Sequence, residues 1–345
     1  MKKVLALALA LALAAVGLFG CAASSSSAAS PAAPVSSAAP VSVAEPAAAP
    51  VGIRVGGLKG PTSMGMVRLM QQAEEGKAAN DYVFTIAGSA DEVTPKLISG
   101  DLDIAAVPAN LASVLYNNTK GAVKLLAINT LGVIYLVENG ESVQTFEDLR
   151  GKTIYATGKG STPEYALKYI LSSNGLDPQK DVTIEWKAEP TEIVALLGQS
   201  AQGVALLPQP YVSAAQAKLP GLRVAIDLNQ AWTELDNGSM FLTGVLVVRT
   251  AFAQEHPEQI AAFLDEYKAS TEYVNANVPE AAALVEKYGI IKAAIAQKAI
   301  PFCNITYIEG AEMKSAMAGY LKVLFEQNPK SVGGTLPDDG FYYAR

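Results

Sequence analysis

The chain has 345 residues, of which half are hydrophobic and 17% are charged. This length suits two lobes of ordinary size, and this composition excludes a disordered chain. The net charge of −7 argues against a nucleic-acid partner held by phosphate neutralisation. One histidine, His256, and two cysteines, Cys21 and Cys303, argue against a His/Cys zinc site and a disulfide framework.

The N-terminus is typical of an export signal. Two lysines precede an apolar run of 16 residues, Val4 to Phe19, which is short for a membrane span. The run ends in Leu18-Phe19-Gly20-Cys21, which resembles a bacterial lipobox. We therefore expect a lipoprotein signal peptide over residues 1–20 and lipidation, as with palmitate, at Cys21. An ordinary signal peptide or a short membrane anchor is the alternative.

Residues 21–50 are predicted to form a tether. Ala22 to Pro50 consists almost wholly of Ala, Ser, Pro and Val, with one charge at Glu45. Such a segment has no periodicity and no apolar face to bury, so we expect it to stay disordered. No later segment reaches 18 apolar residues without charges, so we expect a soluble body beyond the tether.

From Val51 onward, short apolar runs alternate with amphipathic stretches, which predicts strands alternating with helices. Strands are expected at 51–57, 82–88, 104–108, 123–129, 133–138, 153–158, 182–187, 203–207, 222–227 and 244–248. Helices are expected at 62–75, 91–99, 111–117, 163–174, 192–197, 211–217, 257–277, 279–288, 292–299 and 311–327, with a helical turn at 145–149. The pattern indicates an α/β protein with two parallel sheets, a cleft at the carboxyl ends of the strands, and a region after residue 257 that is nearly all helix.

Several local phrases carry a family resemblance through their order along the chain. They are LISGDLDI at 97–104, FEDLRGKTI at 146–154, GSTPE at 160–164, LPQPY at 207–211, and LVVRTAF at 246–252 followed by HPE at 256–258. In this order they resemble the substrate-binding proteins of bacterial ABC importers, in the branch that binds sulfonates, taurine, nitrate and thiamine precursors. The resemblance covers about residues 51–288.

The resemblance implies a two-lobed periplasmic-binding-protein-like fold of type II, with two parallel-rich sheets, a hinge and a helical C-terminal region. Lobe one is then expected over 51–130 and 245–345, lobe two over 138–237, and hinge segments over 129–138 and 239–247. The chain departs from the family at Gln209, where many relatives carry Glu before the second proline. This neutral side chain weakens a direct transfer of ligand identity.

Three loops that precede predicted helices are candidates for ligand binding, because a helix start offers free N–H groups and a partial positive charge. They contribute Lys59, Pro61, Thr62 and Ser63 from loop 57–64, Gly88 and Ser89 from loop 87–91, and Gly160, Ser161 and Thr162 from loop 158–163. A capped tight turn is the alternative for each. Equivalent places in both lobes favour ligand contact for the first and last of these loops.

Further candidates lie at strand ends. Asn110 can contact ligand or cap a helix, and Asn129 can contact ligand or form a turn. Gln209 is a candidate contact, and Tyr211 can stack on ligand or cover the core. Lys59 and Lys159 are expected to be solvated or to neutralise an anion at the cleft edge. Trp232 and Phe241 are expected to pack near the hinge.

The sequence lacks the signatures of an enzyme. Gly151-Lys152-Thr153 has no glycine at the required upstream position of a phosphate loop and leads into a strand. No G-x-S-x-G nucleophile elbow occurs. We expect His256 in a surface turn and Cys303 as an apolar filler. The expectation is therefore a protein that is not an enzyme and holds no cofactor and no metal.

The expected function is that of a solute-binding component of an ABC importer, which captures a small organic solute by hinge closure. The partners would be this ligand, a permease with its ATPase, and the membrane through a lipid anchor on the extracytoplasmic side; the protein would be a monomer. A sulfonate-like or other organic anion is the expected ligand. A thiamine precursor or other heterocycle, an enzyme (a synthase) on the same fold, and a sensor lipoprotein remain as alternatives.

Overall fold

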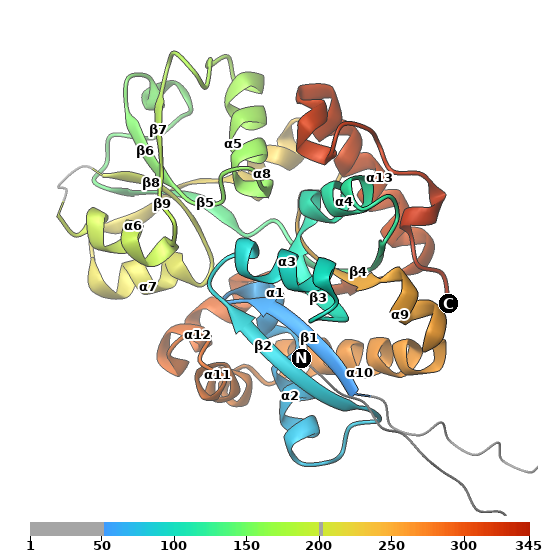
Figure 1. The fold of residues 1–345 in the computed structure, drawn as a ribbon. Coiled ribbons are helices and arrows are strands. Elements are labelled where there is room, and N and C mark those ends of the chain that lie inside the picture. Colours follow the sequence, from blue (N-terminus) through green and yellow to red (C-terminus); the bar gives the residue numbers. More distant parts are fainter. Residues whose placement is uncertain (1–51, 200–202) are drawn as a thin grey trace, which may run out of the picture. The chain divides into compact units, whose positions relative to one another are not determined.

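The computed structural model describes residues 52–199 and 203–345 (Figure 1). The predicted signal peptide, Cys21 and the tether lie outside the described residues. Within the described ranges, no helix combines the length and the apolar character needed to span a bilayer. Two sheets with helices on their faces make up this part of the chain, which confirms the predicted α/β class.

Sheet A is a mixed sheet in the described part of the chain. Its pairs β1–β2 and β1–β3 are parallel, whereas β10 pairs antiparallel with β3 and β4, and β11 with β4. The order of its six strands is β11 (Ile305–Ile308), β4 (Val123–Leu131), β10 (Leu242–Arg249), β3 (Ile104–Pro108), β1 (Gly52–Leu58) and β2 (Asp81–Ala87). The C-terminal region, which was expected to be nearly all helix, also contains the short strand β11, which follows the 3₁₀ turn η2 (Ile300–Phe302).

Sheet B is also mixed. Strand β6 pairs in parallel with β7 and β8, and β5 pairs antiparallel with β8 and β9. The order of its five described strands is β7 (Thr183–Trp186), β6 (Thr153–Ala156), β8 (Val204–Pro208), β5 (Ile134–Asn139) and β9 (Leu222–Asp227). The sheets are thus less parallel than the alternation of strands and helices predicts, because the strands next to the crossings between the sheets run against their neighbours.

Helices of the sheet A side, which we define as sheet A with the helices around it, precede and follow those of sheet B along the chain (Figure 1). They are α1 (Pro61–Met64), α2 (Val67–Glu74), α3 (Ala90–Ser99), α4 (Ala109–Asn118), α9 (Thr250–Glu255), α10 (Pro257–Ala276), α11 (Val278–Lys287), α12 (Ala293–Ala299) and α13 (Gly310–Gln327), with 3₁₀ turns η3 (Pro329–Val332) and η4 (Asp339–Phe341). The sheet B side holds α5 (Thr162–Ser173), α6 (Pro190–Leu197), α7 (Tyr211–Lys218), α8 (Leu228–Glu234) and the turn η1 (Glu147–Leu149). Helices α8 and α9 were not expected from the sequence.

The helix predicted over 62–75 is broken into α1 and α2, and a serine from a distant helix is the reason. Ser270 Oγ accepts a hydrogen bond from Leu69 N at 3.1 Å and donates one to Gly65 O at 2.7 Å. These are the two backbone groups that a continuous α-helix would join to each other. The hydroxyl replaces that bond and opens the helix at Gly65.

One apolar core is shared by both sheets. It contains Leu125 of sheet A and Leu206 of sheet B together with Trp232, Phe241 and Tyr320. Trp232 stacks on Phe241 with ring centroids 5.0 Å apart and lies 5.6 Å from Tyr320. Trp232 and Phe241 are almost fully buried, which confirms the packing expected for them. Two further cores cover the opposite face of each sheet.

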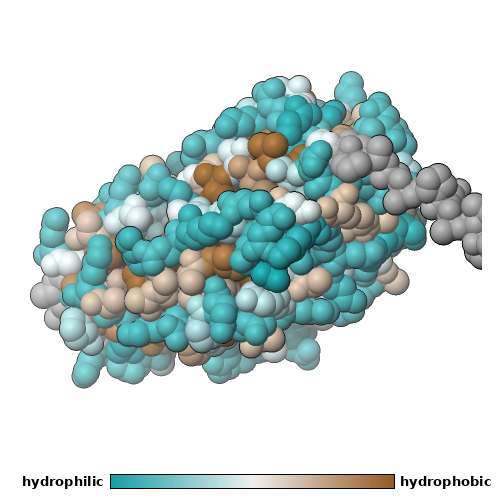
Figure 2. Space-filling model, turned by 90° about the horizontal axis from the view of Figure 1, so that it is seen from below, coloured by the Kyte–Doolittle hydropathy of each residue, from teal (hydrophilic) through white to brown (hydrophobic). Residues whose placement is uncertain are grey.

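The outer surface is mostly hydrophilic in the view of Figure 2, with small hydrophobic groups of residues between the polar ones. Exposed large apolar side chains such as Val83, Ile98 and Phe302 come from three separate elements. Such a scatter is ordinary for a protein surface.

The described chain crosses from sheet A to sheet B at Gly132-Val133, between β4 and β5, and returns through residues 235–241, between α8 and β10. Gly132 is buried against the sheet B side. A Cβ atom at this position would lie 2.6 Å from Cδ1 of Phe241 and 2.8 Å from Cβ of Asn229. Only glycine therefore lets the crossing pass this close to α8 and the returning segment.

We predict that Gly132→Ala lowers the free energy of unfolding by about 1–3 kcal/mol, the usual cost of overpacking. Urea denaturation followed by circular dichroism measures the change. Gly52→Ala is the matched control, because nothing lies within 4 Å of a Cβ at Gly52. Equal unfolding midpoints for the two variants would contradict the prediction.

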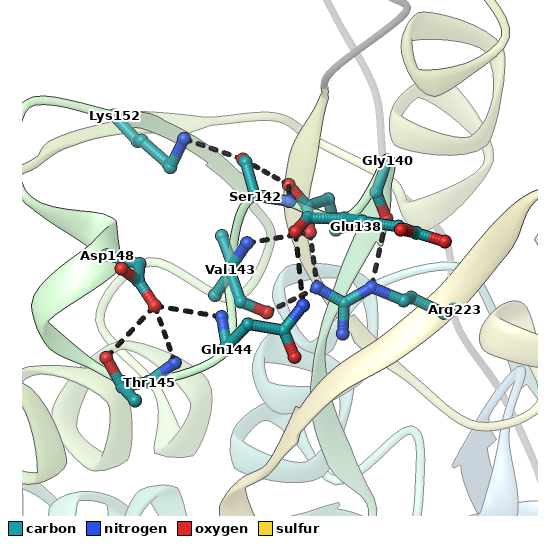
Figure 3. A network of polar contacts seen from close by, with 10 residues as sticks. Glu138, Gly140, Ser142, Val143, Gln144, Thr145, Asp148, Lys152 and Arg223 are labelled. Atoms are coloured by element: carbon teal, nitrogen blue, oxygen red, sulfur yellow. Dashed lines mark hydrogen bonds and ion pairs between the residues drawn. The ribbon is translucent and has the colours of Figure 1, made fainter.

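A polar network fixes the far end of β5 (Figure 3). Glu138, which is fully buried, accepts hydrogen bonds from Ser142 N at 2.9 Å and Val143 N at 3.0 Å, and from the Ser142 hydroxyl. Arg223 of β9 donates to the same carboxylate at 2.7 Å and to Gly140 O at 2.9 Å. Burial raises the pKa of Glu138, but these hydrogen bonds outweigh burial and leave the pKa below its usual value.

Because the folded-state pKa is lowered, ionised Glu138 stabilises the fold above the unfolded pKa of about 4.3, and this contribution is lost as pH falls through the folded pKa. We predict that Glu138→Gln costs about 1–3 kcal/mol at pH 7 and that the difference from the native chain shrinks at acid pH. Urea unfolding at several pH values tests this. Glu147→Gln, at an exposed ion pair with Arg150, is the control and is expected to change little.

Candidate functional site

A cavity of about 510 Å³ lies where loops of the two sides face each other. Its walls come from loops 58–62 and 88–91 on the sheet A side and from loops 157–163, 187–190 and 208–211 on the sheet B side. These loops follow the carboxyl ends of β1, β2, β6, β7 and β8, which is where ligands bind in open α/β sheets. Thr130, Val133, Ile134 and Thr243, at and beside the crossings, also line it, as do Pro108 at the end of β3 and Leu111 of α4.

Most of the residues singled out from the sequence come together here. Those that line the cavity are Lys59, Pro61, Thr62, Gly88, Ser89, Gly160, Ser161, Thr162, Gln209 and Tyr211. Ser63, Asn110 and Asn129 do not line it. The structure thus groups residues that are up to about one hundred and fifty positions apart around one hollow, because strand ends from both sheets meet there.

The three other candidates are fully buried on the inner side of their elements. Ser63 lies beside Gly57, on the inner side of α1. Asn110 Nδ2 donates to Ser331 O at 2.9 Å. Asn129 Nδ2 donates to Thr62 O and to the Tyr267 hydroxyl, each at 3.2 Å. Asn129 thus joins segments of the sheet A side beneath the cavity, whereas Asn110 also accepts a hydrogen bond from Thr162 Oγ1 of α5 at 3.3 Å.

Several lining residues were not found from the sequence. Thr157 and Lys187 follow β6 and β7, so the rule of carboxyl strand ends could have located them. Thr130 and Thr243 lie on β4 and β10, which are neighbours in sheet A. Their place in the cavity depends on a strand order that local sequence patterns do not reveal.

Two of the helices that start at the cavity, α3 and α5, are capped by their own glutamates. Glu92 Oε1 accepts from Gly88 N at 3.0 Å and from Ser89 N at 3.1 Å at the start of α3. Glu164 Oε2 accepts from Gly160 N at 2.6 Å at the start of α5. These N–H groups already hold a carboxylate, so they are not free donors for a ligand. For these amides of loops 87–91 and 158–163, the structure agrees with the alternative of a capped tight turn.

Hydroxyl groups at the cavity differ in whether they are already bonded. Thr62 Oγ1 is buried and has no hydrogen-bond partner among the described residues. Ser161 Oγ donates to Gly158 O at 2.8 Å, and Thr162 Oγ1 donates to Asn110 Oδ1 at 3.3 Å. The Thr62 hydroxyl is therefore a buried donor without a partner among the described residues, whereas the hydroxyls of Ser161 and Thr162 donate to other groups of the protein.

Charged side chains of both signs surround the cavity. Of the four charged lining residues, three are lysines (Lys59, Lys159 and Lys187) and one is Asp91. Lys59 and Lys159 are exposed, as expected from the sequence, whereas Lys187 is half-buried with its ammonium 5.5 Å from the Tyr155 ring centroid. Lys187 is also ion-paired with Glu185 at 3.1 Å.

Tyr211 bridges the two sides. Its hydroxyl makes a long hydrogen bond of 3.5 Å to Lys59 O across the cavity. Burial and the nearby Glu189 carboxylate raise the pKa of Tyr211, so its hydroxyl stays protonated at neutral pH. Beside it, Gln209 is buried, and its Oε1 accepts from Ser213 Oγ at 3.0 Å, which leaves the amide nitrogen as the remaining donor of this side chain.

Residues with catalytic potential elsewhere in the chain have structural roles. The His256 ring packs against the Phe252 ring with centroids 4.7 Å apart. Cys303 is fully buried, and burial raises the pKa of its thiol. In the described ranges, no three His, Cys, Asp or Glu side chains gather in a way that could hold a metal ion.

Comparison with known proteins agrees with this architecture. Residues 73–288 match the model of the NMT1-like family. Comparison with curated proteins gives no match. An ABC transporter structure from Parabacteroides distasonis is 26% identical, with a TM-score of 0.70 over 85% of this chain and 99% of that chain.

Two sulfonate-binding proteins share the fold at lower identity. The periplasmic aliphatic sulphonate binding protein SsuA of Escherichia coli is 19% identical, with a TM-score of 0.69 over 86% of this chain and 93% of that chain. The alkanesulfonate-binding protein SsuA of Xanthomonas axonopodis pv. citri, bound to MOPS, is 14% identical, with a TM-score of 0.66 over 86% of this chain and 96% of that chain.

These likenesses confirm the predicted periplasmic-binding-protein-like fold and the family resemblance. The family match covers more than half of the sequence, and the cavity stands where such proteins are expected to hold a solute. The chain belongs to the NMT1-like family and is a solute-binding component of an ABC import system, not an enzyme.

Proposed function

We propose that this protein captures a small organic anion with an apolar body in the cavity between its two sides and delivers it to a membrane permease. The observation that carries the proposal is the character of the lining. The lining combines apolar side chains such as Leu111 and Ile134 with three lysines and with Thr62, whose buried hydroxyl has no partner among the described residues. Such a site suits a solute with an apolar body and an acceptor-rich head.

The charge pattern supports an anion over a cation. Three lysines face one aspartate among the charged lining residues. Gln209 adds an amide where many relatives carry Glu, so the wall does not repel a negative head at this point. The two sulfonate-binding proteins of similar fold support a sulfonate as the head group.

A neutral heterocycle is the second candidate ligand. The capping of α3 and α5 by Glu92 and Glu164 favours it, because this removes the backbone donors on which anion binding at helix starts depends. The aromatic ring of Tyr211 offers a face on which a flat ligand could stack. The two candidates make different demands on the lysines and can be separated by experiment.

The proposed mechanism is hinge closure. Lobe one, over 51–130 and 245–345, and lobe two, over 138–237, would move about the segments 129–138 and 239–247. The two crossings in the described residues lie within or next to these segments. A solute that contacts both sides stabilises the closed arrangement over the open one.

The proposal extends to where the protein works. A lipid at Cys21 and the tether up to residue 50 would hold a monomeric binding body at the extracytoplasmic face of the membrane, within reach of the permease and its ATPase. The lipobox-like sequence and the low-complexity composition of this segment support the arrangement.

A thermal-shift comparison of butanesulfonate, butanol and a pyrimidine tests the ligand class. We expect butanesulfonate to raise the melting temperature, since a ligand at about 100 times its Kd stabilises the native state by about 2.7 kcal/mol. Butanol has the same apolar body without the charge and is expected to have little effect. Stabilisation by the pyrimidine alone would contradict the anion and favour the heterocycle.

Replacement of Thr62 by Val tests the unused hydroxyl. We expect binding of butanesulfonate to weaken about tenfold, the loss of one hydrogen bond to a charged group, as measured by titration calorimetry. Stability of the free protein should be unchanged, because the hydroxyl has no partner among the described residues. Thr183→Val, on the exposed face of β7, is the control. Unaltered affinity in Thr62→Val would exclude this hydroxyl from the binding site.

A further inference from the structure

We infer that Tyr320 and Asn110 are positioning residues that set the width of the cavity from outside it, by holding the start of α5 against the sheet A side. Tyr320 lies on α13 and Asn110 on α4, and neither lines the cavity. Their common partner is Thr162, the first residue of α5, which does line it.

The contacts form an unbroken polar chain, which we call the Thr162 chain. The Tyr320 hydroxyl donates to Thr162 Oγ1 at 3.1 Å, and Thr162 Oγ1 donates to Asn110 Oδ1 at 3.3 Å. Asn110 Nδ2 in turn donates to Ser331 O at 2.9 Å, in the turn η3 that follows α13. All of these residues are almost fully buried.

The Thr162 chain joins α4 and α13 of the sheet A side to α5 of the sheet B side. Helix α4 directly follows β3, and α13 leads into η3, whose Ser331 is bonded to Asn110. Helix α5 follows β6 and lies beside sheet B (Figure 1). Within residues 52–199 and 203–345, the Thr162 hydroxyl thus links the first turn of α5 to the sheet A side through two hydrogen bonds.

Burial makes this link specific for one arrangement of the two sides. If α5 moved away from α4 and α13, Asn110 Oδ1 and the Tyr320 hydroxyl would lose Thr162 as a partner in a region that excludes solvent. Buried polar groups without a partner are costly, so the bonded arrangement is favoured. The neighbouring apolar contact between Tyr320 and Trp232 has no such directional demand.

This arrangement also determines what the cavity can bind. Thr162 stands in the wall, so a shift of the α5 start changes the distance between the two walls. Suppose that a ligand binds only at one spacing of the two walls. Its apparent Kd then equals its intrinsic Kd divided by the fraction of molecules that have this spacing. Tyr320 and Asn110 therefore act on affinity through Thr162 without touching the ligand.

A distance measurement without ligand tests the inference independently of the proposed function. Nitroxide labels are attached to cysteines introduced at two exposed positions, Lys96→Cys on α3 and Thr183→Cys on β7. The full-length chain also carries Cys21→Ser, and Cys303 stays unlabelled because it is buried. Double electron–electron resonance then gives the distribution of distances between the two sides. In Tyr320→Phe, which keeps the ring, we expect this distribution to broaden and shift to longer distances.

Tyr116→Phe is the matched control, because it also removes a tyrosine hydrogen bond, but one to Asp338 within the sheet A side. Its distance distribution should equal that of the unsubstituted chain. Thr162→Val should broaden and shift the distance distribution as Tyr320→Phe does, whereas Thr162→Ser, which keeps a hydroxyl, should give the native distribution. In the double variant Tyr320→Phe, Thr162→Val, the distribution should equal that of Thr162→Val alone. An unchanged distribution in both Tyr320→Phe and Thr162→Val would overturn the inference.

A second measurement rests on the proposed function and uses butanesulfonate as the probe. We expect Tyr320→Phe to weaken its binding about two- to tenfold, and Tyr116→Phe to leave it unchanged. If the native chain binds no butanesulfonate, the proposed ligand fails while the distance measurement still decides the positioning role. Native affinity in Tyr320→Phe together with a shifted distance distribution would overturn the link between wall spacing and binding.

Discussion

The rest of the structure depends on one continuous apolar core that both sheets share. Trp232, Phe241 and Tyr320 occupy its centre, where α8, the returning segment and α13 meet. Only short segments carry the backbone between the sheets within the described residues, so this packing, more than the chain itself, keeps the two sides in register. The cavity lies where the shared core gives way to the loops at the carboxyl ends of the strands. The floor of the cavity therefore rests on the packed core, and its mouth is formed by loops.

Internal hydrogen bonds decide which polar groups of the cavity remain available. Glu92 and Glu164 occupy the helix starts, and the hydroxyl of Thr162 is spent on Asn110. The Thr62 hydroxyl remains unused. A site of this kind recognises a solute through a few polar groups and through shape, because Gly88 N, Ser89 N and Gly160 N already hold carboxylates of the protein.

The sequence predicted most of the elements and three of the loops that line the cavity, but not α8, α9 or β11. Apolar periodicity placed most strands and helices, and the rule of carboxyl strand ends brought Lys59, Gly160 and Tyr211 to one place. What escaped prediction came from contacts across the chain. Ser270 breaks a helix two hundred positions earlier, and Asn129 turns inward to Tyr267. Periodicity describes which face of an element is apolar, but it does not say which polar residue another element will bind.

The position of Trp232 in the shared core makes tryptophan fluorescence informative for this protein. The chain has two tryptophans, Trp232 and Trp186. The first stacks on Phe241 next to the returning segment, and the second ends β7, directly before the lining residue Lys187. One indole thus lies beside the segment that returns to sheet A, and the other belongs to the residue directly before a lining residue of the cavity. The intrinsic fluorescence of the native chain reports on both places without any attached dye.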